Sequence, residues 1–442
     1  MNNRHLKSIS ALLSLLALIG AISTPAHAVD DAYIDVHGGL GTQHKIALPV
    51  FVAERGGSAA AKMAEEIPRI VAWDLDFSGH FAVVDKYRYP TTFRGLPADV
   101  HDLDLGDWWE AQVRYLLHGT VNVQGDQMSV QWRLFDVVSR RQVVGMEYRA
   151  DTSLVRGAAH RMSNKIIERL IGGKGIADSR ICFVSTATGQ RELYIADYDG
   201  QNLERLTNDG AEKLTPVWSP DRKMLAFTSY IDNNPDLYLI QVETRFQNRL
   251  AGYQNLNIAP SWSPDGKRLA LTLSKDGNSE IYLIDVNGGN LKRLTRNAVT
   301  DTSPTFSPDG REIAFVSTRS GRPQIWIMNA DGRGTARRVS FQGGNSYDPN
   351  WSPAGDKIAY VSERSGEGLE IYTVETNGRN AARLTDAIGA NEAPSWSPDG
   401  KYLTFASSRE GSWNIYLMRA DGGGCRRITF MGGDATGPDW WP

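Results

Sequence analysis

A five-residue motif that returns every 44 or 45 residues constrains the fold of this chain more than any other feature. Its clearest copy is Trp262-Ser263-Pro264-Asp265-Gly266, and an aromatic residue heads every copy. The six heading residues are Trp218, Trp262, Phe306, Trp351, Trp396 and Trp440, the last of them in a degraded copy that ends the chain. A period of this length is typical of a β-propeller or another stacked repeat.

Each repeat also contains four short strand-like stretches separated by turn residues. After Ser-Pro-Asp-Gly, which suits a type I turn because proline fixes φ, an apolar stretch such as Leu269–Leu271 predicts the second strand. The pair Ile281-Tyr282 marks the third strand, Asn287-Gly288 a tight hairpin, and Arg293-Leu294-Thr295 the end of the fourth. A four-stranded unit of this period predicts a propeller blade. We refer to its strands as a to d.

The order of the strands predicts how the ring closes. The first strand b, at 181–185, precedes the first strand a, which ends at Trp218, and no strand b follows Trp440. The C-terminal strand is therefore expected to complete the first blade and to remove its exposed edges. We predict an all-β six-bladed propeller over residues 179–442, preceded by a linker at 172–178.

Residues 29–171 lack the repeat and predict a separate α/β domain. One helix is expected where Ile67, Ile70, Val71 and Leu75 fall on a single apolar face, and a second helix ends near Leu170. Alternating apolar and polar residues at 115–123, 128–135 and 142–149 predict an antiparallel meander.

Residues 1–28 have the features of a secretory signal peptide. Arg4 and Lys7 precede an apolar stretch at 9–22, and Ala26-His27-Ala28 suits signal peptidase. A transmembrane anchor is the alternative, but the apolar run is too short for a span. We therefore predict an exported protein, not embedded in a membrane, whose mature chain begins at Val29.

Composition excludes one class of partner and leaves one question open. The formal charge of −3 gives no excess of basic residues for nucleic acid. The two cysteines, Cys182 and Cys425, could pair in an oxidising compartment. They occupy different positions of the repeat, one in a core strand and one after a hairpin turn, which favours two unpaired thiols.

One face of the predicted propeller suits partner binding better than the other. The a–b and c–d turns share a face and are nearly identical, whereas the b–c and d–a loops of the other face vary in length and chemistry. The d–a loops, which border the channel, carry Asp209, Glu212, Asp301, Asp348, Asp386, Glu392 and Asp434, with Lys213 as their one basic residue. Singly, such carboxylates are usually solvated surface groups. Together they predict an electronegative channel mouth that receives a basic or donor-rich protein segment.

Signals for catalysis are poor. The chain has no G-x-S-x-G, and its histidines do not follow H-E-x-x-H or another metal-ligand spacing. We predict neither catalytic residues, nor a metal, nor a cofactor. The alternative is a secreted or periplasmic propeller enzyme that acts on glycans or peptides.

In its order of signal peptide, small α/β domain and six blades headed by W-S-P-D-G, the chain resembles the TolB family of the Tol–Pal system of Gram-negative bacteria. The resemblance covers essentially the whole mature chain. It implies a non-enzymatic periplasmic protein, monomeric outside its complex, that supports outer-membrane integrity and constriction at cell division. It also implies that Pal, the peptidoglycan-associated lipoprotein, binds the channel face of the propeller, which colicins also use, and that TolA binds the N-terminal tail.

The resemblance also assigns residues to these two sites. On the channel face it points to Ala259 and Thr302, close before the strand-a prolines, and to position 256, where familiar members have histidine and this chain has Leu256. With the rim carboxylates, the predicted channel-face site comprises Leu256, Ala259, Asp301, Thr302, Asp348 and Glu392. The predicted tail site at 29–36 comprises Asp30, Asp31, Tyr33, Ile34 and Asp35, a segment that could also be an ordinary first strand.

Overall fold

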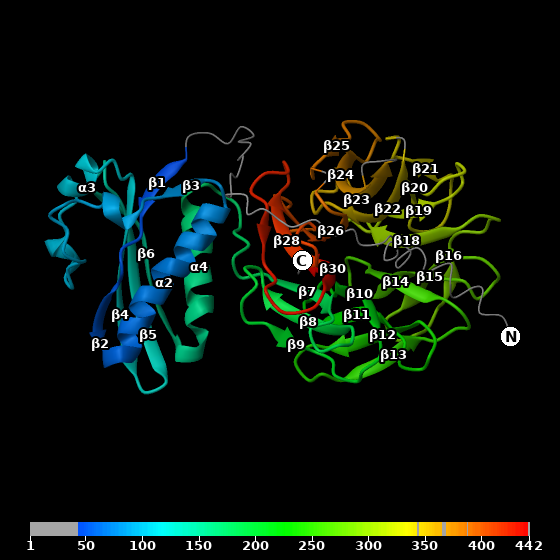
Figure 1. The fold of residues 1–442 in the computed structure, drawn as a ribbon, viewed down its shortest axis with the longest axis horizontal. Helices are drawn as coiled ribbons and strands as arrows, with labels where there is room; N and C mark the ends of the chain where they lie inside the picture. The colour runs from blue at the N-terminus through cyan, green and yellow to red at the C-terminus, as the bar shows by residue number, and fades with distance from the viewer. Residues whose placement is uncertain (1–42, 343, 365–367, 387, 441–442) are drawn as a thin grey trace, which may run out of the picture. The chain divides into compact units, whose positions relative to one another are not determined.

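Before the propeller, a six-stranded sheet and two long helices form an α/β region (Figure 1). The structure is a computed structural model that describes residues 43–442, except 343, 365–367, 387, 441 and 442. The expected signal peptide and N-terminal tail lie outside the described residues. The helices and strands of the α/β region are β1 (His44–Ala47), β2 (Val52–Arg55), α2 (Gly57–Phe77), β3 (Phe81–Val83), η1 (Lys86–Arg88), η2 (Val100–Asp102), α3 (Gly106–Glu110), β4 (Tyr115–Gln124), β5 (Gln127–Asp136), β6 (Arg141–Asp151), η3 (Thr152–Leu154) and α4 (Val155–Leu170).

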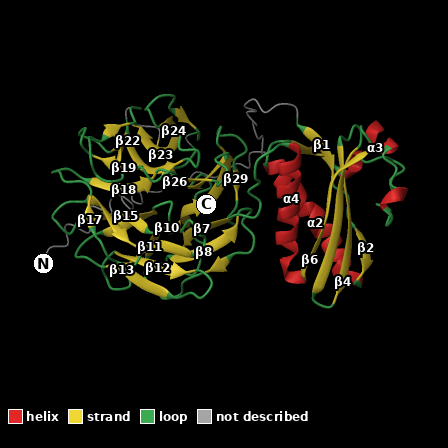
Figure 2. Ribbon diagram, turned by 180° about the vertical axis from the view of Figure 1, so that it is seen from behind, coloured by secondary structure: helices red, strands yellow, loops and turns green. Residues whose placement is uncertain are grey.

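The sheet has the order β3-β1-β4-β5-β6, with β2 also paired to β4. β1 runs parallel to β3 and β4, whereas β4, β5 and β6 form the predicted antiparallel meander. Helices α2 and α4 lie on the same face of this sheet (Figure 2), and their apolar side chains share one core with it. None of the helices in the described part of the chain has the length and hydropathy that a membrane crossing requires.

Helix α2 contains a proline without losing a hydrogen bond. Ile67, Val71 and Leu75 are fully buried, which stabilises the helix against the sheet by roughly 2 kcal/mol for each side chain. Pro68 has no N–H to donate to Ala64, and the Ala64 carbonyl instead accepts from the Phe51 N–H at 3.0 Å. The missing donor of the helix is thus supplied by the segment that precedes it.

The repeats form six four-stranded antiparallel sheets (Figure 1). Blade 1 is β30 (Ala435–Trp440), β7 (Arg180–Ser185), β8 (Glu192–Asp197) and β9 (Glu204–Arg205); blade 2 is β10 (Lys213–Trp218), β11 (Met224–Ser229), β12 (Asp236–Gln241) and β13 (Gln247–Ala251); blade 3 is β14 (Asn257–Trp262), β15 (Arg268–Leu273), β16 (Glu280–Asp285) and β17 (Lys292–Arg293). Blade 4 is β18 (Asp301–Phe306), β19 (Glu312–Ser317), β20 (Gln324–Asn329) and β21 (Arg337–Arg338); blade 5 is β22 (Asn345–Trp351), β23 (Lys357–Arg364), β24 (Gly368–Glu375) and β25 (Ala382–Arg383); blade 6 is β26 (Asn391–Trp396), β27 (Tyr402–Ser407), β28 (Asn414–Arg419) and β29 (Arg426–Arg427). Because β30 pairs with β7, the predicted six-bladed fold and its closure by the C-terminal strand are confirmed.

The repeated motif is a turn held together by its own side chains. In blade 3, the Ser263 hydroxyl donates to the Asp265 carboxylate at 2.6 Å and accepts from the Arg268 N–H at 3.0 Å. Gly266 ends the turn with φ of 68°, in the left-handed region that favours glycine. Blade 5 has Ala354 in place of the aspartate, and Asp356 accepts from the serine hydroxyl instead, at 2.9 Å. The motif therefore has a structural role, because its side chains hold the a–b turn of the blade together.

The innermost strand of every blade is bulged just before its proline. In each of the six, the residue before the proline has a positive φ of 48–57°, and the pairing with strand b shifts there. These residues are Thr215, Ala259, Ser303, Asp348, Ala393 and Gly437. Glycine occupies one of the six positions, so the bulge is set by strand geometry and not by a glycine.

The side chain that follows the proline of an inner strand can form hydrogen bonds to a neighbouring blade. The Asp439 carboxylate accepts from the Trp218 N–H at 2.8 Å and from the Ser395 hydroxyl at 3.0 Å. The Ser395 hydroxyl in turn accepts from the Trp440 N–H at 3.0 Å. Asp439 therefore closes the ring between two segments that are 221 residues apart in the chain.

Replacing Asp439 with alanine should destabilise the protein by about 1–3 kcal/mol, because the buried Trp218 N–H would lose its acceptor. Thermal or denaturant unfolding measures this loss. Asp439→Asn is the matched control, since its amide oxygen can still accept from Trp218, and it should lie close to the wild type. Equal losses in both variants would contradict a role for the hydrogen bond.

Candidate partner-binding face of the propeller

The b–c and d–a loops lie at the same end of the blades because neighbouring strands in each blade are antiparallel. The inner strands β14, β18, β22 and β26 contact one another in sequence around the channel. They carry the predicted site residues Ala259, Thr302, Asp348 and Glu392, one from each strand. The structure therefore brings these four residues to successive inner strands, and Leu256 lies just before β14, half-buried, with its N–H donating to Ser274 Oγ at 3.1 Å.

Asp348 and Glu392 form an electrostatically coupled pair on neighbouring inner strands. Asp348 reaches solvent inside the channel, yet the channel wall limits its hydration and raises the pKa of its carboxyl. Glu392 is half-buried, and burial, followed by the charge of Asp348, raises its pKa to about 7, although Arg191 opposes the shift. The negative charge of this pair therefore increases as the pH rises towards and past neutrality.

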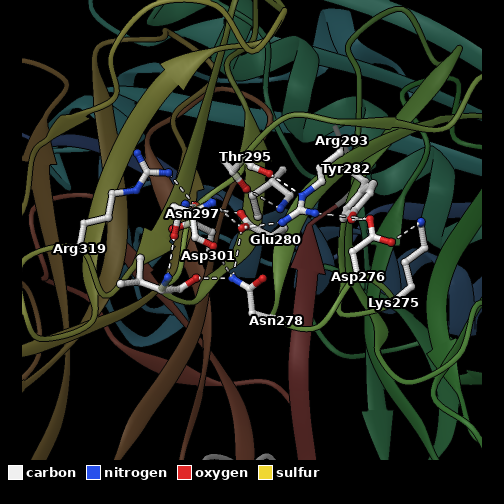
Figure 3. Close-up of polar contacts among 12 residues, drawn as sticks. Lys275, Asp276, Asn278, Glu280, Tyr282, Arg293, Thr295, Asn297, Asp301 and Arg319 are labelled. Carbon is white, nitrogen blue, oxygen red and sulfur yellow. Dashed lines mark hydrogen bonds and ion pairs between the residues drawn. The ribbon is translucent and has the colours of Figure 1, made fainter.

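Asp301 differs from these two carboxylates, because its side chain is fully buried. Its Oδ2 atom pairs with Arg319 Nη2 at 2.6 Å and accepts from Asn297 Nδ2 at 2.7 Å (Figure 3). The sequence pattern predicts Asp301 as one of the accessible rim carboxylates. The structure corrects that placement, because the ion pair with the b–c loop of blade 4 holds the side chain inside.

The d–a loop before Asp301 is fixed by a polar network (Figure 3). Glu280, whose side chain is fully buried, accepts from Arg293 Nη2 at 3.0 Å and from the Asn297 N–H at 2.8 Å. The Thr295 hydroxyl accepts from the Ile281 N–H at 2.9 Å. Blade 3 therefore sets the position of the loop that leads into blade 4.

The basic residues of this face come from the b–c loops as well as from the d–a loops, and they form ion pairs with rim carboxylates. Lys213, read as the single cation of the d–a loops, is buried and pairs with Glu192 at 3.5 Å and with Asp209. Arg191 and Arg319, which the d–a loop sequences do not include, come from the b–c loops and pair with Glu212 at 3.4 Å and with Asp301. The rim is thus partly neutralised at Asp209, Glu212 and Asp301, whereas Asp348 and Asp386 are exposed and Glu392 and Asp434 are half-buried.

Both cysteines are free thiols, as the sequence favoured. Cys182 is buried in β7, where burial raises the pKa of its thiol well above the usual value. Cys425 is half-buried, and burial likewise raises its pKa to about 11. Neither is therefore a thiolate near neutral pH.

Comparison with protein-family models gives two matches along the chain. The model described as the TolB beta propeller domain matches residues 167–368 and 345–442, and the model described as the TolB amino-terminal domain matches residues 32–143. The propeller model alone therefore matches more than half of the chain.

Curated proteins and solved structures agree with these matches. The Tol-Pal system protein TolB of Desulfosudis oleivorans is 37% identical over 218 residues, which is 49% of this chain and 50% of that protein. The Tol-Pal system protein TolB of Geobacter sulfurreducens is 38% identical over 223 residues, half of each protein. The chain thus spans about half the length of the curated relatives it matches. The crystal structure of TolB from Acinetobacter baumannii superposes with a TM-score of 0.79 and 29% identity over 91% of this chain and 97% of that one.

Proposed function

The chain belongs to the TolB family, and from that premise we propose that it is a non-enzymatic protein-binding component of a Tol–Pal envelope complex in the periplasm. It binds Pal through the channel face of the propeller and TolA through the N-terminal tail at 29–36. In this way it supports outer-membrane integrity and constriction at cell division. It is a monomer outside the complex.

The observation that supports this proposal most is the composition of the channel face. Asp348 and Glu392 present negative charge beside the uncharged Ala259 and Thr302 on successive inner strands. A partner segment that offers a cationic group or several N–H donors would find its acceptors there. Colicins, which the family resemblance adds as ligands of the same face, would use the same acceptors.

The opposite face of the propeller is already in use within the chain. The Tyr402 hydroxyl of blade 6 donates to the Ser78 carbonyl at 3.1 Å, and Arg426 pairs with Asp76 at 2.6 Å. Both contacts join the end of α2 and the residue after it to blade 6 on the side of the a–b and c–d turns. The b–c and d–a loops therefore offer the better surface for a separate protein.

Co-purification from an envelope extract tests the proposal. Immobilised mature protein should retain a peptidoglycan-bound lipoprotein, and excess soluble propeller should compete it away. Retention of no lipoprotein would contradict the proposal. Hydrolysis of glycans or peptides that is lost when channel residues are changed would support the alternative of a propeller enzyme.

Deleting residues 29–36 should abolish TolA binding and leave Pal binding intact, because the two partners are assigned to different sites. The reason for separate sites is that the tail precedes the α/β region, whereas the channel face belongs to the propeller. Binding of both purified partners to the deleted and full mature chains can be measured by calorimetry.

A scrambled 29–36 segment is the matched control, since it keeps the length and charge of the tail; it should fail with TolA as the deletion does. Loss of both partners in the deleted chain would contradict the two-site proposal. In that proposal the tail is docked on its own protein in one state and free for TolA in the other, and Pal shifts the balance.

A further inference from the structure

One buried carboxylate joins both helices of the α/β region to the propeller. Asp74 of α2 lies 2.9 Å from Nδ1 of His160 in α4, and it accepts from the Tyr198 hydroxyl of blade 1 at 2.6 Å. The side chains of Asp74 and His160 are 0% and 3% exposed, and Tyr198 is 1% exposed. We call Asp74, His160 and Tyr198 the junction cluster.

Charged groups surround His160 on its second nitrogen as well. Arg156 Nη2 lies 3.4 Å from His160 Nε2, and Asp199 Oδ2 lies 4.0 Å from it. Arg156 also pairs with Asp199 and lies 3.7 Å from Asp197, which Arg180 approaches to 3.9 Å from β7. The groups that face the imidazole are thus Asp74 from α2, Arg156 from its own helix, and Tyr198 and Asp199 after β8, with Asp197 beyond them.

A metal site is not the best account of this cluster. His160, Asp197 and Asp199 can bring one ligand atom each within 4.8 Å of one another, which is a spacing that a metal ion could use. The Arg156 guanidinium, however, pairs with Asp199 and lies beside Asp197. A divalent cation would have to displace this arginine or sit next to its charge, so the cation of the cluster is Arg156.

The charge of Asp74 makes the protonation of His160 consequential. When His160 is neutral, its N–H group and the Tyr198 hydroxyl contact the buried Asp74 carboxylate without supplying a counter-charge, and an uncompensated buried charge is costly. When His160 is protonated, the imidazolium supplies the missing counter-charge to Asp74; its Nε2 lies 4.0 Å from Asp199 Oδ2 and no longer accepts from Arg156 Nη2, which is 3.4 Å away. Repulsion from Arg156 opposes protonation, but Arg156 already shares its charge with Asp199.

We propose that His160 is a proton-dependent clamp between the α/β region and the propeller, whose imidazolium form holds the junction cluster together and whose neutral form loosens it. The proposal goes beyond the proposed function and does not depend on the identity of any partner. The junction keeps other contacts that do not titrate near neutrality. These include the Tyr402–Ser78 hydrogen bond and the stacking of Phe77 on Tyr402, whose ring centres are 4.9 Å apart. Loss of the proton therefore weakens the junction without removing it.

The direction of the pH dependence follows from the surroundings of His160. Burial opposes the imidazolium, but the hydrogen bond and charge of Asp74, with help from Asp199, outweigh it and raise the pKa of His160 above its ordinary 6.5. A histidine whose pKa is raised by folding stabilises the folded state fully below its unfolded pKa and loses that effect as the pH rises through the folded pKa. The junction should thus be tightest below about pH 6.5.

Nuclear magnetic resonance of the mature chain with ¹³C-labelled histidine tests the proposal directly. The His160 signal, identified by its loss in His160→Asn, should titrate with a midpoint above 6.5, and Asp74→Asn should shift that midpoint downward. Amide exchange at the end of α2, corrected for intrinsic rates, should quicken as the pH passes that midpoint in the wild type and lack this step in His160→Asn.

Tyr402→Phe is the matched control, because it removes a junction hydrogen bond that does not titrate near neutral pH. Tyr402→Phe should speed amide exchange at the end of α2 equally at every pH, and it should retain the increase in exchange at the His160 midpoint. A His160 midpoint at or below 6.5 would overturn the proposal, and so would the same pH step in wild type and His160→Asn. If His160→Asn does not fold, the His160 signal is identified as the one whose midpoint falls in Asp74→Asn, and the presence or absence of an exchange step at that midpoint in the wild type decides the matter.

Discussion

Replacing Arg319 with alanine is expected to lower the free energy of unfolding by about 3–5 kcal/mol, because it leaves the Asp301 carboxylate buried without its cation. Asn297 would remain as a hydrogen-bond donor to Asp301, but it carries no charge. The guanidinium carbon also lies 5.2 Å from the ring centre of Phe315 and 5.8 Å from that of Trp326, and those contacts would be lost too. Denaturant unfolding followed by circular dichroism measures the effect.

Two further variants separate the buried charge from the loss of side-chain volume. Arg322→Ala removes an exposed arginine from the same b–c loop and should change stability by no more than about 0.5 kcal/mol. Asp301→Ala combined with Arg319→Ala removes both charges and should cost less than Arg319→Ala alone. A double variant at least as unstable as the single one would show that the buried charge is not the cause.

The same variants decide what Asp301 does for partner binding. Because Asp301 is buried in a network that sets the d–a loop, its replacement should reduce Pal binding only to the extent that it disturbs the loop. Asp301→Asn, which can still accept from Asn297 and Arg319, should therefore bind Pal nearly as the wild type does. A large loss of affinity in Asp301→Asn with unchanged stability would instead make this carboxylate a direct contact.

The propeller could be predicted from the sequence because its signals are local. Ser263, Asp265 and Gly266 make the turn with bonds that span no more than five residues, so the motif carries its own structure. The closing strand followed from counting strands, since Trp440 ends an inner strand that has no strand b after it. Local chemistry that recurs from blade to blade is enough to define a blade and a ring.

The pairing of the rim charges could not be read in this way. Asp301 meets Arg319 across 18 positions of the chain, and Lys213 meets Glu192 across 21, only because strand register brings loops of the same face together. A count of d–a loop residues alone includes Asp301 as free charge and omits the arginines of the b–c loops. The positive φ of Ala259 and Asp348 was also missed, because a residue before proline usually takes an extended conformation.

Within the predicted acidic mouth, Asp348 and Glu392 lie on neighbouring inner strands and are electrostatically coupled, and this pair makes the second strong prediction. Neutralising both in Asp348→Asn/Glu392→Gln should weaken Pal binding by at least about 2 kcal/mol, roughly thirty-fold in Kd, because partly desolvated acceptors of a cationic or donor-rich segment would lose their charge. The salt dependence of binding should flatten as well. Titration calorimetry with purified Pal at several salt concentrations measures both.

Binding should also depend on pH through the same two residues. Because burial and the charge of Asp348 raise the pKa of Glu392 to about 7, the ionised form that binds a cationic segment is incompletely populated below neutrality. Wild-type affinity should therefore increase from about pH 6 to about pH 8, and the increase should vanish in the neutral pair. Asp309→Asn/Asp331→Asn is the matched control, since it removes two exposed carboxylates from turns of the opposite face and should keep both the affinity and its pH dependence. An affinity that is the same in all three proteins would place Pal on another surface.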